Sequence, residues 1–414
     1  MPDNDQPPAL LRRLFDRAVE VADPMRSLAG YLPPRPAGRV TVIGAGKASA
    51  RMAEAVEAEW GPCEGLVITR YGYARPTQAI RIVEAAHPVP DQAGRQATDE
   101  MLDLLAGLRP EDFVLALISG GASALLTAPA GRVTLAEKQA VNRMLLASGA
   151  PIGQMNVLRK HLSRVKGGQL AAAAHPARML ALLVSDVPGD DPALIGSGPT
   201  VGDDSTVADA LAITRQWGLE LPASVQDALA GESGVVPTAD PRLSRVENVI
   251  CAAPSASLQA AADMARAAGY EVEILGDAIE GEARDIARAH ADLARAAKGP
   301  CILLSGGELT VTRQGDGTGG PNAEYALALA LALDDAPGIH AIACDTDGVD
   351  GAAEVAGALI GPDTLRIARQ QGADPQAALA RNDAHGFFAA IGGQVVTGPT
   401  LTNVNDFRAI LIEG

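Results

Sequence analysis

Two Ser-Gly-Gly segments follow apolar runs of the kind that form buried strands, and each could bind an anion. Residues 113–118 lead into Ser119-Gly120-Gly121, and residues 301–304 lead into Ser305-Gly306-Gly307-Glu308. After the first segment we expect a helix to begin near Ser123, so that free backbone N–H groups point at one spot. Glycines let the backbone approach a phosphate or carboxylate, and the Ser119 and Ser123 hydroxyls add donors. An ordinary glycine turn after a strand is the alternative for each copy.

A third glycine turn, Gly44-Ala45-Gly46-Lys47, follows a short β-branched run and precedes a predicted helix. It is not a Walker A phosphate loop, because that motif needs a glycine where Thr41 stands and a hydroxyl where Ala48 stands. The dipole of the following helix also disfavours a cation at this place. Lys47 is therefore either a solvated surface lysine or a lysine held there to meet a transferring phosphoryl group.

Two groups of aspartates follow other predicted strands and are candidate magnesium ligands. Magnesium is usually held by one or two carboxylates together with phosphates of the substrate, so either group could supply it. Helix capping and turn formation are the alternative use of the same residues. The first group comprises Asp186, Asp190 and Asp191, and the second comprises Asp345, Asp347 and Asp350.

Residues 156–174 have a helical pattern and carry several basic side chains before Gly167-Gly168. A helical spacing places Arg159 and Lys166 on one face. Such a face is usually solvated. Because glycines follow it directly, the second interpretation is that this face binds an anion. Because the chain has a formal net charge of -16, cations that cluster beside glycine turns are informative.

The composition indicates a globular protein of two domains, since the chain has 414 residues, of which 47% are hydrophobic and 20% charged. No apolar run is long enough to span a membrane, and the acidic, then amphipathic N-terminus predicts a cytoplasmic protein. The negative charge argues against nucleic acid or a membrane surface as a partner. The cysteines are scattered, which argues against disulfides and a zinc site.

Strands and helices alternate along the chain, which predicts an α/β fold with a doubly wound sheet in the N-terminal half. We place an N-terminal Rossmann-like domain at residues 1–240 and a smaller C-terminal α/β domain at residues 241–414, because residues 231–244 are rich in proline and glycine. The predicted strands are 39–43, 65–70, 80–85, 113–118, 179–185, 248–253, 271–275, 301–304, 340–344, 394–397 and 407–411. The predicted helices are 10–21, 48–60, 135–146, 156–174, 255–269, 282–298 and 322–333.

Eight motifs occur in order from about residue 10 to the C-terminus, and together they resemble the class II glycerate 2-kinases, whose C-terminal part is the MOFRL domain. The motifs are VIGAGKAS, LISGGASALL, LRKHLSRVKGGQLA, VSDVPGDDPALIGSGPT, LSGGELTV, GTGGPNAE, DTDGVDG and TGPTLTNVNDFRAILI. The resemblance implies a Rossmann-like N-terminal lobe, a smaller C-terminal MOFRL lobe and an active site in the cleft between them. It also implies ATP- and magnesium-dependent phosphorylation of D-glycerate to 2-phosphoglycerate.

On this pattern Lys47 matches the catalytic lysine of the family, and we expect Lys47 and magnesium on Asp186 or Asp190 to neutralise charge as the phosphoryl group moves. Lys47 and Asp186 are thus the predicted catalytic residues. The predicted metal ligands are Asp186, Asp190, Asp345 and Asp347. The residues predicted to bind substrate or phosphate are Gly44, Gly46, Ser119, Gly120, Gly121, Ser123, Arg159, Lys166, Ser305, Gly306, Gly307, Glu308, Asn322 and Glu324.

One departure from the family concerns its second cation, an arginine that many members carry in the glycine loop before Asn-x-Glu. Thr318 and Pro321 occupy the two usual places in this chain. Arg159, Lys160 or Arg313 could take over its role, and the sequence does not distinguish among the three.

The alternative function is an NAD(P)H-dependent hydroxypyruvate reductase, a label that some members of the family have carried. A dinucleotide fingerprint needs a glycine or alanine where Ser49 stands, and an acid at the end of the next strand, where Thr69 and Arg70 stand. A non-catalytic sugar-acid-binding protein is a third possibility, but it would have no use for Lys47 and the aspartate groups. We therefore expect D-glycerate and a nucleotide as ligands, and a homodimer is compatible with the sequence.

Overall fold

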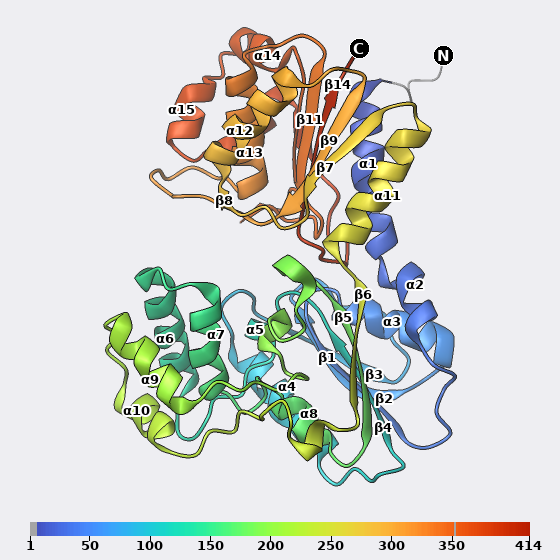
Figure 1. The fold of residues 1–414 in the computed structure, drawn as a ribbon, viewed down its shortest axis with the longest axis vertical. Coiled ribbons are helices and arrows are strands. Elements are labelled where there is room, and N and C mark those ends of the chain that lie inside the picture. The colour runs from blue at the N-terminus through green and yellow to red at the C-terminus, as the bar shows by residue number, and fades with distance from the viewer. Residues whose placement is uncertain (1–5, 352) are drawn as a thin grey trace. The chain divides into compact units, whose positions relative to one another are not determined.

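The computed structural model describes residues 6–351 and 353–414 and contains two compact units. The N-terminal unit comprises Ser27–Ser185 and Asp190–Cys251. The C-terminal unit comprises the described residues up to Arg26, the short segment Asp186–Gly189, and Ala252–Gly414. Each unit has its own sheet with helices packed against it (Figure 1), so the predicted α/β fold with two lobes is confirmed.

The N-terminal unit is built on a six-stranded sheet with the order β3-β2-β1-β4-β5-β6. Pairing is parallel from β3 through β5. Every residue of β1 and β4 is buried, as expected for central strands covered on both faces. This is the doubly wound order, in which ligands bind beyond the carboxyl ends of the two strands where the order reverses, here β1 and β4. The strands are β1 (Val40–Ala45), β2 (Glu64–Arg70), β3 (Ile80–Ala85), β4 (Phe113–Ile118), β5 (Arg178–Val184) and β6 (Val246–Ala252).

Helices of the N-terminal unit begin where the sequence offers a cap. Thr134 starts α6 in a capping box with Glu137, and Thr206 starts α9 in the same way with Asp209. The α-helices of this unit are α3 (Ser49–Trp60), α4 (Gln92–Leu105), α5 (Ala122–Leu125), α6 (Leu135–Ser148), α7 (Ile152–His161), α8 (Gln169–Ala174), α9 (Val207–Gln216) and α10 (Ala223–Ala230). The short α2 (Pro24–Ser27) lies where the chain passes into this unit. Short 3₁₀ turns are Leu28–Tyr31, Pro188–Asp190, Ile195–Ser197 and Pro241–Leu243.

The C-terminal unit contains a mixed six-stranded sheet with the order β13-β12-β11-β14-β9-β7. Its pairs are antiparallel except for β7 with β9. The strands are β7 (Glu271–Gly276), β9 (Cys301–Gly307), β11 (Ile339–Asp345), β12 (Gly357–Ile360), β13 (Gln394–Val395) and β14 (Asp406–Ile412), and β8 (Gly281–Glu282) pairs separately with β10 (Leu309–Thr310). Strand β12, which is only four residues long, was not predicted from the sequence.

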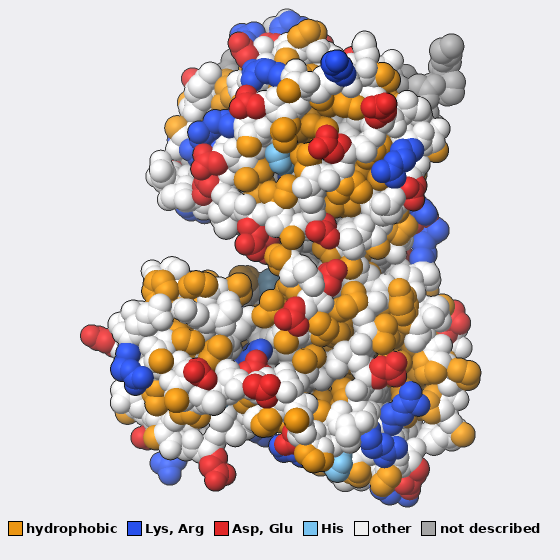
Figure 2. All heavy atoms as spheres, viewed as in Figure 1, with side chains coloured by type: hydrophobic (Ala, Val, Ile, Leu, Met, Phe, Trp, Pro, Cys, Tyr) orange, Lys and Arg blue, Asp and Glu red, His pale blue; other side chains and the backbone are white. Residues whose placement is uncertain are grey.

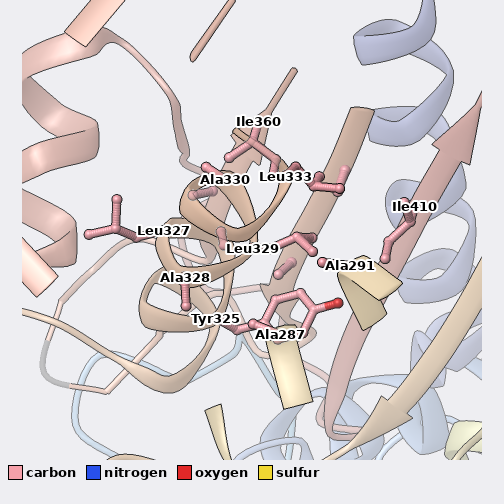
Figure 3. Packing of buried hydrophobic residues seen from close by; sticks show 14 of the residues in the cluster. Ala287, Ala291, Tyr325, Leu327, Ala328, Leu329, Ala330, Leu333, Ile360 and Ile410 are labelled. Carbon is pink, nitrogen blue, oxygen red and sulfur yellow. The ribbon is translucent and has the colours of Figure 1, made fainter. Parts of the chain in front are cut away.

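Helices cover both faces of this second sheet. On one face, α1 (Pro7–Ala22) and α11 (Pro254–Ala267) lie side by side (Figure 1) and share an apolar core with it. On the other face, the almost uniformly apolar α13 (Pro321–Leu333) packs with α12 (Ala283–Ala296) around Tyr325, Leu329 and Ile410 (Figure 3). The unit is completed by α14 (Thr364–Gln371), α15 (Pro375–Ala380) and α16 (Ala384–Ile391).

The two units divide the chain differently from the expected boundary between residues 240 and 241. The chain passes from one unit to the other at Cys251, after β6 has joined the first sheet. The helix α1 belongs to the C-terminal unit, because its apolar face packs on the second sheet: the rings of Phe15 and Phe407 are 5.9 Å apart. The hydroxyl of Ser257 also donates to the carbonyl of Ala18 at 2.8 Å.

Two local predictions were wrong. The helix expected over residues 156–174 is two helices, because α7 ends at His161 and α8 begins after the left-handed Gly167 and Gly168. The second Ser-Gly-Gly segment is not a turn, since Ser305, Gly306 and Gly307 continue β9 and pair with β14. The helix expected to begin near Ser123 is present as α5, which begins at Ala122 and has four residues.

Charged side chains of both signs are dispersed over the face drawn in Figure 2, without a broad basic surface on that face. Among residues 6–351 and 353–414, no helix has the length and the hydropathy that a membrane crossing requires.

Candidate functional site

The turns after β1 and β4 are joined by hydrogen bonds at the point where the strand order reverses. The backbone N–H of Lys47 donates to the carbonyl of Gly120 at 2.8 Å, and that of Ala48 donates to Oγ of Ser119 at 3.0 Å. The Ser49 hydroxyl donates to the carbonyl of Leu117 at 2.9 Å. The N–H groups that lead into α3 are therefore bonded within the protein, and the buried Ser119 serves to join the two turns.

The glycines predicted in these turns permit this close packing. A Cβ on Gly44 would lie 2.4 Å from the carbonyl oxygen of Leu117, and one on Gly46 would lie 2.0 Å from Oγ of Ser119. Gly121, in the left-handed region at φ 82°, faces a different neighbourhood, because a Cβ there would lie 3.1 Å from the ring of His87 and 3.3 Å from Cγ of Lys47. Gly121 thus brings the first Ser-Gly-Gly turn, Lys47 and His87 together.

A cavity of about 280 Å³ opens beside Gly121 within the N-terminal unit. It contains four of the predicted binding residues, which are Gly121, Ser123, Arg159 and Lys166. Its lining combines apolar side chains with three basic ones. The remaining lining residues are His87, Pro88, Pro90, Ala124, Lys138, Val141, Asn142, Leu145, Leu146 and Leu162.

Three cations, Lys138, Arg159 and Lys166, meet at this cavity and are bonded to neutral groups. Nζ of the fully buried Lys166 donates to the carbonyls of Ser123 and Leu126 at 2.8 and 3.3 Å. Nζ of Lys138 donates to a carbonyl at 3.4 Å, and Nε of Arg159 donates to an asparagine side-chain oxygen at 2.9 Å. Within the described chain none of the three has a carboxylate partner, and the described residues that line the cavity include no acid.

Burial and mutual repulsion disfavour the charged forms of these side chains. Burial lowers the pKa of Lys138 to about 8, with the nearby Arg159 adding to the effect. Burial also holds the pKa of Lys166 well below its usual range and lowers the pKa of Arg159. Lys160 differs, because its Nζ lies 2.5 Å from a carboxylate oxygen of Asp203. An anion in the cavity would relieve the repulsion among the three unpaired cations.

Arg159 and Lys166 reach one cavity for a reason other than the predicted helical spacing. Helix α7 ends at His161, two residues after Arg159. The chain then turns on Ser163, whose Oγ accepts the N–H groups of Val165 and Lys166. The two side chains therefore converge through a chain reversal, so the prediction that one helix face carries both was wrong.

The first aspartate group is divided between the units. Asp186 belongs to the C-terminal unit, where Nδ2 of Asn403 donates to its Oδ2 at 3.1 Å and Nδ2 of Asn405 donates to its carbonyl at 3.1 Å. Asp190 belongs to the N-terminal unit, and its Oδ1 is buried without a hydrogen-bond partner. An orphaned buried carboxylate oxygen is a feature that a bound cation would satisfy.

The second group forms turns after β11. Oδ1 of Asp345 accepts the N–H of Asp347, and Oδ1 of Asp347 accepts the N–H of Val349, each at 2.8 Å. Both carboxylates therefore stabilise the turn, which was the alternative interpretation. Over the described residues, no group of three or more His, Cys, Asp or Glu side chains has a geometry that could hold a metal ion.

The second Ser-Gly-Gly segment surrounds a buried arginine. Nη2 of Arg408 donates to the carbonyls of Gly306 and Gly307 at 2.5 and 3.3 Å, and its Nε donates to Oγ of Ser305 at 3.3 Å. Nη1 of Arg408 pairs with Asp406 at 3.0 Å. These carbonyl contacts give the segment a structural role, while the predicted Glu308 beside it is exposed.

Asn322 and Glu324 are both buried in the first turn of α13. Nδ2 of Asn322 donates to Oδ1 of Asp406 at 2.7 Å, and burial raises the pKa of Asp406 to about 6. Glu324 accepts from Nε of Arg284 at 2.6 Å and from Nδ2 of Asn382 at 3.0 Å. Glu324 therefore has enough partners to be explained as part of the core.

In the glycine loop before Asn322, neither of the two positions at which the resembled family carries its second cation holds a basic residue. Thr318 is exposed, and its N–H donates to Asp383 at 3.0 Å. Arg313 bonds to the carbonyls of Gly315 and Gly317 at 3.2 and 3.1 Å and so closes its own loop. Of the three proposed replacements, only Arg159 lies in the cationic cavity.

Three polar residues that line the cavity, Lys138, Asn142 and His87, were not predicted from the sequence. Lys138 and Asn142 are four residues apart on α6, and Val141 and Leu145 accompany them on the side that lines the cavity. The signal was a lysine and an asparagine at helical spacing with the two buried apolar positions of α6. His87 is distant from Gly121 in the sequence, and only the fold brings the two together.

Two family models match the chain. Residues 10–230 match a model described as a domain of unknown function, DUF4147. Residues 301–406 match a model of the MOFRL family. The first match includes the whole cationic cavity and Lys47, and the second includes the Ser305 segment and α13.

Relatives match along most of the chain. A protein of Agrobacterium vitis named "Putative hydroxypyruvate reductase" is 51% identical, with 97% of this chain and 94% of that protein covered. The D-glycerate 2-kinase of Thermotoga maritima is 36% identical, with 96% of this chain and 97% of that protein covered. A crystal structure of a glycerate kinase from Thermotoga maritima matches with a TM-score of 0.87 at 36% identity, covering 98% of this chain and 99% of that one.

Proposed function

Because the chain belongs to the glycerate kinase family that the DUF4147 and MOFRL models describe, we propose that it is a glycerate 2-kinase. The enzyme transfers the γ-phosphoryl group of ATP to the 2-hydroxyl of D-glycerate. A named D-glycerate 2-kinase that matches over nearly the full length supports this choice of substrate and of hydroxyl.

The observation that carries the proposal is the cavity with Lys138, Arg159 and Lys166 beside Gly121. Three cations without a carboxylate partner, in a chain of net charge -16, suit a ligand with several negative charges. Buried charges are costly unless they are paired, so the site is more stable with its ligand than without it. Kinases catalyse largely by such positioning and charge neutralisation, and no strong base is required.

Lys47 is proposed as the catalytic cation. It follows β1 directly, its backbone is fixed by the bond to Gly120, and its side chain passes within van der Waals reach of the Gly121 position. A lysine fixed at the carboxyl end of β1 can meet a phosphoryl group that is moving between two oxygens. Asp186, held by Asn403 and Asn405, is proposed as the second catalytic residue.

Magnesium fits the residues present, because it needs only one or two protein carboxylates when phosphates supply the other ligands. Asp190 is the preferred ligand on the ground of its orphaned Oδ1, and Asp186 is the second candidate. Bound magnesium would neutralise charge on the nucleotide phosphates. Both aspartates lie in the segment that follows β5.

The reductase name of the Agrobacterium relative makes NAD(P)H-dependent reduction of hydroxypyruvate the alternative. The turn after β1 argues against it, since its N–H groups at Lys47 and Ala48 are bonded to Gly120 and Ser119 and cannot receive a pyrophosphate. At the end of β2, Thr69 is buried and bonded to the carbonyl of Gly46, so no acid meets a ribose there.

The proposal predicts that the purified protein forms ADP from ATP, magnesium and D-glycerate. Phosphorus NMR of the product should place the new phosphate on the 2-position. A parallel reaction with NADH and hydroxypyruvate is the control and should show no oxidation of NADH. NADH oxidation without any ADP formation would reject the kinase and establish the reductase.

A further inference from the structure

We propose that the cavity between α6 and α7 binds the nucleotide, and that the hydroxy acid binds elsewhere. The inference rests on the proposed kinase function and assigns one ligand to one site. The triphosphate then lies on Lys138, Arg159 and Lys166. The base lies against the apolar wall, which is formed by Val141, Leu145 and Leu146 of α6.

The number of charges favours the nucleotide. D-Glycerate carries a single negative charge, so its carboxylate would leave two of the three cations of the cavity unpaired. A nucleoside triphosphate carries several negative charges and can meet all three. Because uncompensated buried charge is strongly destabilising, the ligand that matches the three cations is the one that the cavity selects.

The apolar wall favours the nucleotide as well. Val141 and Leu145 of α6 are buried and line the cavity, and Leu146 lines its edge with 60% of its surface exposed. D-Glycerate has an oxygen on every carbon and therefore gains little from apolar walls. A purine ring has two faces that can be buried against such side chains.

The glycine turns support a position of the phosphates near Gly121. Gly121 lines the cavity and lies next to Lys47, whereas the N–H groups leading into α3 are bonded within the protein. The nucleotide site is therefore displaced from the turn after β1, where a Rossmann dinucleotide would bind, to the turn after β4. This displacement accounts for the failure of both nucleotide motifs at Gly44 to Lys47.

Calorimetry without D-glycerate measures the binding of ATP and of tripolyphosphate to the full-length protein. The comparison separates the cations, which bind phosphate, from the apolar wall, which binds the base. Lys138→Met should weaken both ligands by about tenfold to 100-fold. Leu146→Ala should weaken ATP about threefold to tenfold and leave tripolyphosphate unchanged. The matched controls are Arg143→Met, an exposed cation of the same helix, and Ile152→Ala, an exposed apolar residue of α7 that does not line the cavity. Both controls should bind as the wild type does.

The outcomes distinguish this inference from the proposed function. If Lys138→Met weakens D-glycerate binding and leaves ATP binding unchanged, the cavity belongs to the hydroxy acid and the inference is overturned, while the kinase stands. If the wild type binds ATP in the cavity and forms no ADP with D-glycerate, the inference stands and the proposed acceptor is wrong. Equal loss of ATP binding in Lys138→Met and Arg143→Met would also overturn the inference, because a general change of charge would then explain both.

Discussion

At the scale of residues, what distinguishes the candidate site is the absence of pairing among its cations. Two other buried cations are neutralised by a carboxylate, Lys160 by Asp203 and Arg408 by Asp406. Lys138, Arg159 and Lys166 are bonded instead to carbonyl and amide oxygens. Such bonds satisfy the donors without cancelling the charge, and a positive potential therefore remains for a ligand.

Lys47 should be a catalytic residue and contribute little to ligand binding. We expect Lys47→Ala to lower kcat by about 100-fold to 1000-fold and to change the Kd of ATP by less than about threefold, because its charge acts on the moving phosphoryl group. Steady-state kinetics with D-glycerate, together with ATP titration, measure the two effects. Lys47→Arg is the control that keeps the charge and should retain part of the turnover. Unchanged turnover in Lys47→Ala would remove Lys47 from the mechanism.

At the scale of elements, the site depends on the close approach of two strand ends. The turns after β1 and β4 share hydrogen bonds from Lys47, Ala48 and Ser49, and glycines leave the space that this approach needs. The chain reversal between α7 and α8 then delivers Lys166 to the same cavity. Rigid strand ends and tight turns hold the polar groups in place before a ligand arrives, which is how binding sites avoid the cost of ordering.

A methyl group on Gly46 should disrupt this junction. Gly46→Ala combines a positive φ of 141° with a Cβ 2.0 Å from Oγ of Ser119, and we expect it to lower the free energy of unfolding by about 3 kcal/mol or more. Gly107→Ala is the matched control, since Gly107 also has a positive φ but no atom within 4 Å of the built Cβ. It should cost only about 1 kcal/mol. Urea denaturation of both variants measures the difference in free energy of unfolding. Equal losses would show that the positive φ alone, and not the contact with Ser119, destabilises Gly46→Ala.

At the scale of the whole molecule, the first described helix and the last strand belong to the same unit. Helix α1 packs on the sheet that contains the last strand, β14, and the hydroxyl of Thr402 donates to the carbonyl of Ala22 at 2.8 Å. The cores of the C-terminal unit include a buried pair, His290 and Tyr325, whose Nδ1 and hydroxyl are 2.8 Å apart. A buried neutral histidine makes the stability of that unit depend on pH.

Acid should destabilise the C-terminal unit through His290. Burial, together with the nearby Arg408, lowers the pKa of His290 to about 4 from its usual 6.5. Between these two values the unfolded chain binds a proton that the folded chain does not, so stability is retained above about pH 6.5 and lost as the pH falls towards 4. The loss amounts to at most about 3 kcal/mol.

Urea denaturation followed by circular dichroism at about pH 7 and about pH 4 tests this dependence. His290→Gln can keep a hydrogen bond to Tyr325 without a titrating group, so it should lose less stability on acidification than the wild type. His175→Gln, at an exposed position, is the control and should behave as the wild type does. An acid loss in His290→Gln as large as that of the wild type would assign the effect to other groups.

The alternation of strands and helices, and with it the α/β fold and its two lobes, could be predicted from local sequence patterns. Buried strands such as β4 are continuous apolar runs, and caps such as Thr134 mark where helices begin, so both are encoded by neighbours in the chain. The sequence also excluded a Walker A loop at Lys47, because that motif is defined by local spacing. Gly121, Ser123, Arg159 and Lys166 were predicted as binding residues, and the structure brings these four to one cavity.

Which charged side chains lie together, and which conformation each glycine segment adopts, depends on tertiary packing. Lys138 and His87 reach the cavity because strand order and helix packing place distant segments together, and local patterns do not encode those contacts. Ser119-Gly120-Gly121 and Ser305-Gly306-Gly307 look alike as sequences, yet the first turns beside a cavity and the second continues a strand around Arg408. The physical reason is that a glycine's freedom permits several conformations, and the surrounding packing selects one.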